Sequence, residues 1–143
     1  LHRAFDCTPD ARKALGTAAS LGFSLVLTSG QKPKVGDGCG LLADLEALRL
    51  GPTLMAGAGL DTEAAERLWD VGLRAFHLSG GEPAESAMRF RRREIRMAPE
   101  GMDEFRRNRC SAVRVAAVRR TLDRLATESG GTAGGCTEGR SMP

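Results

Sequence analysis

The feature that most constrains the fold of this chain is a regular alternation of short apolar segments with longer amphipathic ones. Each apolar run is followed by a segment whose apolar side chains recur every three or four positions, which is the spacing of a helix. The predicted strands lie at residues 1–5, 23–28, 53–59 and 74–79, and the predicted helices at 8–22, 41–50, 62–71 and 111–127. Strands that alternate with amphipathic helices form parallel sheets through right-handed crossovers. The sequence therefore predicts an α/β fold of four strand–helix units.

Four such units make half of a (β/α)8 barrel, so the TIM-barrel architecture is the first interpretation. A small open doubly wound sheet is the alternative, although no G-x-G-x-x-G motif follows the first clear strand. We expect residues 1–128 to form the half barrel, with an irregular stretch near residues 80–110. Residues 129–143 are rich in small and polar residues, and we expect a disordered tail there. Because a half barrel leaves a sheet face and two sheet edges uncovered, the chain is predicted to be marginally stable alone or to pair as a homodimer.

Charge and hydropathy narrow the classes of partner. The net charge of +3 is too small to indicate nucleic acid binding, and no apolar run approaches the ~18 residues of a membrane helix. A cytoplasmic location is therefore the default expectation. The four cysteines lack the close spacing of a zinc site or a redox motif. Positive charge is concentrated in "MRFRRREIRM", which is either a solvated loop or an anion site that includes Arg89.

The alternation of side chains along the predicted strands places several polar residues on one interior surface. The side of each strand that helices cover must be apolar, and to it we assign Leu25, Leu27, Phe76 and Leu78. The side chains left facing the interior are those of His2, Asp6, Thr28, His77 and Ser79. Active sites of barrels are built at the C-terminal ends of the strands, where several of these residues fall. Two histidines and an aspartate on one face are about equally consistent with a functional site and with ordinary core positions. Arg3 falls on the apolar side, which this assignment does not explain.

A glycine turn in "MAGAGL" is the second candidate site. Gly57 and Gly59 free the backbone to turn, and Asp61 then begins a helix whose amides point back toward the turn. Amides beside a helix N-terminus can hold a phosphate or a carboxylate. A tight turn without any ligand explains the same glycines equally simply.

Five motifs together give the chain a family likeness. "LHRAFD", "LTSGQ", "MAGAGL", "AFHLSG" and "MRFRR", in this order and at this spacing, resemble the copper homeostasis protein CutC family over residues 1 to about 97. The resemblance implies a (β/α)8 barrel, of which this chain matches the C-terminal half from the fifth strand onward, so that "LHRAFDC" looks like a strand truncated near its start. The chain departs from the family pattern at Ala58, where a third successive glycine is usual, and at Leu78 and Gly80.

The resemblance implies cytoplasmic copper handling, with copper as the bound metal. The residues expected to hold a metal ion are His2, Asp6, Cys7 and His77, those expected to hold an anion are Gly57, Gly59 and Arg89, and the remaining pocket residues are Arg3, Thr28, Ser29 and Ser79. Soft Cu(I) prefers clustered thiolates and thioethers, and Cys7 is the one cysteine near this group. A barrel enzyme that acts on a phosphorylated or carboxylated small molecule is the alternative, and no catalytic residue is assigned. The expected partner is therefore a metal ion or a small anionic ligand.

Overall fold

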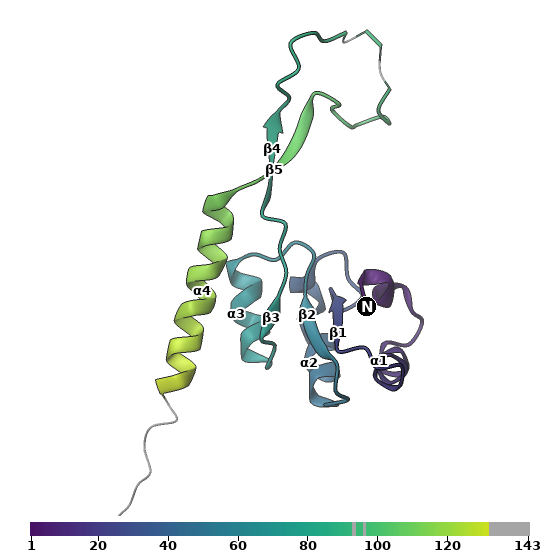
Figure 1. Cartoon of the computed structure of the whole chain (residues 1–143), viewed down its shortest axis with the longest axis vertical. Helices are drawn as coiled ribbons and strands as arrows, with labels where there is room; N and C mark the ends of the chain where they lie inside the picture. The colour runs from purple at the N-terminus through teal and green to yellow at the C-terminus, as the bar shows by residue number, and fades with distance from the viewer. Residues whose placement is uncertain (93, 96, 132–143) are drawn as a thin grey trace, which may run out of the picture.

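The computed structural model of the chain describes residues 1–92, 94, 95 and 97–131. It shows a small parallel sheet with helices on one side, a hairpin that projects away from this body, and a long last helix (Figure 1). The helices are η1 (Arg3–Cys7), α1 (Ala11–Ser20), η2 (Val35–Gly38), α2 (Cys39–Ala47), α3 (Thr62–Asp70) and α4 (Ala112–Gly131), where η marks a 3-10 helix. The strands are β1 (Leu25–Thr28), β2 (Thr53–Ala56), β3 (Ala75–Phe76), β4 (Gly81–Glu85) and β5 (Arg106–Cys110).

The main sheet is parallel, in the order β1-β2-β3, so consecutive strands are neighbours. Thr28 is paired with Ala56, and Ala56 with Phe76, which aligns the C-terminal ends of the three strands. The predicted α/β class with a parallel sheet is therefore confirmed. The described strands form an open sheet, and closure into a barrel stays a prediction.

The face assignment of β1 was wrong. Val26 and Thr28 are fully buried toward the helices, whereas Leu25 and Leu27 are only half-buried on the opposite face. All of residues 25–27 are apolar, so the composition could not set the phase of the strand. In β3 and beyond, the assignment was right for Phe76 and Leu78, both of which pack against the core.

The first predicted strand is also mostly wrong. Leu1 alone pairs with β1, donating its N–H to the carbonyl of Leu25 at 2.8 Å and accepting the N–H of Leu27 at 2.9 Å. The chain then coils into η1, whose N-cap is His2: the imidazole Nδ1 accepts the N–H of Ala4 at 3.0 Å. Because residues 3–7 do not alternate as a strand would, Arg3 is not forced into an apolar layer, and the conflict noted from the sequence disappears.

The helices lie close to their predicted positions. Asp61 caps α3 as expected, its carboxylate accepting the N–H of Ala64 at 2.8 Å. The cap of α1 is Asp10, and the predicted start of this helix, Thr8, instead donates its hydroxyl to the carbonyl of Phe5 at 2.8 Å and ends η1. The spacing on α4 predicts one apolar face of Val115, Val118, Leu122 and Leu125, of which Val118 and Leu125 are buried, Leu122 is partly buried and Val115 is exposed.

Residues 80–110 are not wholly irregular. Strands β4 and β5 pair as an antiparallel hairpin that projects from the body (Figure 1). Opposite charges face each other across it, with Arg109 and Glu82 2.9 Å apart and Arg106 and Glu85 3.7 Å apart. Neither strand has an alternation of apolar and polar side chains, so no strand could be predicted here from the pattern.

The predicted domain boundary at residue 128 falls inside α4, which continues to Gly131. Residues 132–143 of the predicted tail lie outside the described residues. Within the part of the chain that the structure describes, no helix has both the length and the apolar character that a membrane span requires.

Candidate functional site

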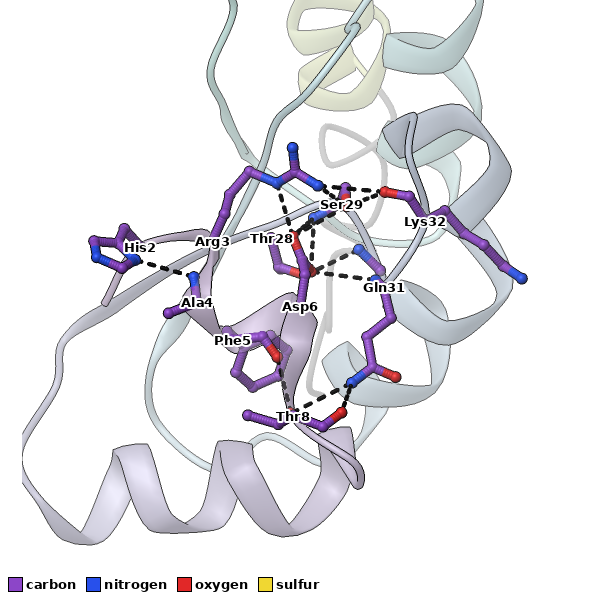
Figure 2. A network of polar contacts seen from close by, with 11 residues as sticks. His2, Arg3, Ala4, Phe5, Asp6, Thr8, Thr28, Ser29, Gln31 and Lys32 are labelled. Carbon is purple, nitrogen blue, oxygen red and sulfur yellow. Dashed lines mark hydrogen bonds and ion pairs between the residues drawn. The ribbon is translucent and has the colours of Figure 1, made fainter.

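The carboxylate of Asp6 is the centre of a polar network at the C-terminal end of β1 (Figure 2). It accepts the hydroxyl of Thr28 at 2.6 Å and the backbone N–H of Ser29 at 3.1 Å. It also accepts the backbone N–H of Gln31 at 3.2 Å and forms an ion pair with Arg3 at 2.8 Å. One side chain of η1 therefore holds the whole turn that follows β1.

The environment of Asp6 favours the ionised carboxylate. Its side chain is only 7% exposed, and this burial raises the pKa. The hydrogen bonds from Thr28, from Arg3 and from two backbone N–H groups outweigh the burial, so the pKa of Asp6 lies below its ordinary value. The carboxylate is consequently charged at neutral pH, and its oxygens are already occupied by donors.

Each residue of the "TSGQ" turn has a defined partner. The Ser29 hydroxyl accepts Arg3 at 2.9 Å and lies 2.5 Å from the carbonyl of Lys32. Gln31 takes a left-handed backbone with φ 57°, and its side-chain amide donates to the carbonyl of Thr8 at 2.6 Å. Two of the segments that carry the family likeness, "HRAFD" and "LTSGQ", thus form one interlocked unit.

Two glycines let the loop after this turn fold back against it. A Cβ added at Gly38 would lie 2.0 Å from the carbonyl oxygen of Ser29, and one added at Gly30 would lie 2.6 Å from the carbonyl oxygen of Gly38. Both obstacles are backbone atoms, which cannot rotate away. The contact therefore requires glycine at both positions.

The four predicted metal ligands do not converge. Asp6 points to the buried, helix-covered side with Thr28, whereas His77 is exposed beyond β3 on the opposite face, beside Gly57. His2 caps η1, and Cys7 is an exposed free thiol at the end of that helix. Among the described residues, no three His, Cys, Asp or Glu side chains are arranged to hold a metal ion.

The remaining predicted pocket residues divide in the same way. Arg3, Thr28 and Ser29 belong to the Asp6 network, while Ser79 is exposed after β3. From the sequence, Asp6 was predicted as a metal ligand and Arg3, Thr28 and Ser29 as pocket residues; the structure joins the four in one network that holds the turn.

The three residues predicted to bind an anion are also separated. Gly57 lies on the open sheet face, where an added Cβ would meet Leu27 at 2.7 Å. Gly59 is at the strand-end loops, and Arg89 is exposed on the segment between β4 and β5. The described part of that segment lies at the far end of the hairpin, away from the parallel sheet and its glycine turn (Figure 1).

The middle residue of the glycine turn is strained. Ala58 has φ 83°, a conformation that costs an L-residue about 1 kcal/mol and costs glycine nothing. We therefore expect Ala58→Gly to raise the free energy of unfolding by about 1 kcal/mol. Urea unfolding followed by circular dichroism measures the change. Ala19→Gly within α1 is the control, for which a loss of about 0.5–1 kcal/mol is expected; a loss at Ala58 as well would contradict the prediction.

A pocket of about 450 Å3 lies where the loops after β2 and β3 meet the first turns of α3 and α4. Its lining includes two basic side chains, Lys34 and Arg114, and the hydroxyl-bearing Ser79 and Thr62. Sequence reasoning missed both basic residues, because eighty positions separate them and neither belongs to an Arg-rich run. Another pocket, of about 490 Å3 along α1, is lined mainly by apolar side chains and offers less chemistry.

The parallel sheet, the helices on one face and the polar groups at the strand ends define a protein of the α/β class with a strand-end site. The model of the CutC family matches residues 1–82, which is more than half of the chain. The chain belongs to the CutC family.

Curated relatives agree with this assignment. A family protein CutC of Salmonella agona (strain SL483) is 36% identical over 119 residues, which cover 82% of this chain and 48% of that protein. A second from Edwardsiella ictaluri (strain 93-146) is 33% identical over 126 residues, covering 88% of this chain and 50% of the relative. The chain thus spans about half the length of the curated relatives it matches.

Proposed function

We propose that the chain acts in cytoplasmic copper homeostasis as the C-terminal half of a CutC-family barrel. Membership of the family carries this proposal. The interlocked motifs around Asp6 support it, because they hold the C-terminal end of β1 in a fixed shape, as a strand-end site of a barrel needs.

The residues predicted to bind copper do not fit a preformed copper site. The oxygens of Asp6 are taken by hydrogen bonds, and Nδ1 of His2 accepts a backbone N–H. Cu(I) favours soft sulfur ligands, and of the four predicted ligands only Cys7 supplies one. Of the four predicted ligands, Cys7 is therefore the one at which we place a copper contact of this chain.

A Cu(I) competition titration of the purified chain tests this placement. We expect Cys7→Ser to weaken Cu(I) binding, and Cys110→Ser, which removes a cysteine that is also exposed, on the hairpin, to leave it unchanged. Equal affinity in all three proteins would exclude Cys7 as a ligand.

A second function is favoured by one observation, the pocket at the strand ends. A cavity of about 450 Å3 with basic and hydroxyl groups at its rim suits a small phosphorylated or carboxylated molecule. The role is then binding or turnover of that molecule, as in other proteins that place ligands at the C-terminal ends of parallel strands.

A further inference from the structure

We propose that the strand-end pocket binds the phosphoryl group of a small molecule, which Lys34 and Arg114 hold by charge. This proposal rests on the second function above and names its ligand class and the residues that hold it.

The backbone places Lys34 at the pocket. The N–H of Val35 donates to the carbonyl of Ala58 at 2.9 Å, which fixes the loop that carries Lys34 against the glycine turn. A Cβ added at Gly59 would lie 3.4 Å from Cγ of Lys34, so the aliphatic part of that side chain runs across the glycine. The absence of a side chain at Gly59 therefore lets Lys34 line the pocket.

Arg114 enters from the other side, on the first turn of α4. Its guanidinium donates to the carbonyl of Gly81 at 2.6 Å, which uses one of its five N–H donors and anchors the group at the pocket rim. No ion pair within the described part of the chain involves Lys34 or Arg114.

Each of the two acidic groups nearby has a hydrogen-bond partner outside the pair of basic side chains. The carboxylate of Asp61, which also lines the pocket, caps α3 through the N–H of Ala64. Glu82 is paired with Arg109 at 2.9 Å, and the hydrogen bonds with Arg109 and Ser111, followed by the charges of Arg109 and Arg114, lower the pKa of Glu82. The charged groups that line the pocket itself are two cations and one carboxylate, so the pocket has a net positive charge.

The remaining lining explains why the ligand is a small organic phosphate. Leu60, Val118 and Leu78 line the pocket, the first two buried and the third half-buried, and offer apolar contact to a carbon skeleton. If the chain supplies the last four strands of a barrel, β2 and β3 are its seventh and eighth strands, and the pocket lies at the loops that follow them. Barrels frequently bind phosphate at these two loops.

Titration of the 15N-labelled 143-residue chain with inorganic phosphate at constant ionic strength tests the proposal. We expect phosphate to shift the amide resonances of Gly59, Ser79 and Gly80, and the double variant Lys34→Gln/Arg114→Gln to bind phosphate at least tenfold more weakly. The control, Lys32→Gln/Arg120→Gln, removes the same charge from exposed residues of the same loop and helix that do not line the pocket. The dispersion of each spectrum shows whether the variant is folded.

Three results overturn the proposal. Equal weakening in the two double variants would show a general charge effect. Succinate that shifts these amides where phosphate does not would remove the phosphoryl assignment and leave the second function standing. No response to either anion would remove both the assignment and the second function, while the copper titration remains an independent measurement.

Discussion

Asp6→Asn is expected to lower the free energy of unfolding by about 3 kcal/mol or more. The asparagine keeps the size of the side chain but loses its charge and turns one acceptor into a donor. It then faces the hydroxyl of Thr28, the N–H of Ser29 and the guanidinium of Arg3 with too few acceptors. Each buried donor left without a partner costs about 1–3 kcal/mol, and a whole domain is stable by only about 5–15 kcal/mol. Urea unfolding monitored by circular dichroism measures the loss.

The matched control for this variant is Asp44→Asn. Asp44 forms an ion pair with Arg12 at the same distance, 2.8 Å, but both side chains are more than half exposed. Exposed pairs contribute about 0–1 kcal/mol, so the control is expected to change stability by less than 1 kcal/mol. Equal losses at Asp44 and Asp6 would show that the network does not stabilise the turn.

The effect of Asp6 is also expected to depend on pH. Because the folded pKa lies below the unfolded one, the unfolded chain takes up the proton first as the pH falls. The stability that Asp6 provides is therefore complete above the unfolded pKa of ~3.9 and is lost as the pH falls through the lowered folded pKa. The difference between the wild-type and Asp6→Asn proteins should shrink over that interval and stay constant from pH 5 to 7.

Helical spacing proved the most dependable signal in the sequence. The apolar stripe on α3 and the capping residue Asp61 fixed that helix to within one residue of its observed end. The phase of β1 could not be fixed, because a strand between two layers is apolar on both faces. Residues 1–5 were predicted as a strand because they complete the alternation of strands and helices, whereas residues 3–7 coil into η1, where Asp6 is hydrogen-bonded to a turn more than twenty residues later.

In the candidate site, too, sequence patterns identified individual residues but not the contacts that distant residues make with one another. The motif residues Asp6, Thr28 and Ser29 were identified, yet a list of side-chain types does not show whether a carboxylate is open to a ligand or filled by donors. Lys34 and Arg114 were missed because only the folded chain brings them to one pocket. Local sequence patterns therefore could not predict a site whose residues lie far apart in the chain.

The second large effect is expected at the contact between Gly30 and Gly38. Gly38 has φ −95°, which alanine adopts without strain, so Gly38→Ala tests steric contact alone. The new Cβ would lie 2.0 Å from the carbonyl oxygen of Ser29, and the backbone of one of the two loops has to move. Overpacking of this kind costs about 1–3 kcal/mol and sometimes more, and because the obstacle is backbone we expect a loss of about 3 kcal/mol.

Gly40→Ala, two residues further along, is expected to have the opposite sign. Gly40 lies in α2 and an added Cβ there meets nothing within 4 Å, so alanine should stabilise the helix by up to about 1 kcal/mol. The same urea measurement compares the two variants, and a change of the same sign in their free energies of unfolding would contradict the predicted clash at Gly38.

Ser29 links this contact to the Asp6 network, since its carbonyl faces Gly38 while its N–H donates to Asp6. The losses from Gly38→Ala and Asp6→Asn should therefore fall short of additivity in the double variant, because either change alone displaces the same residue.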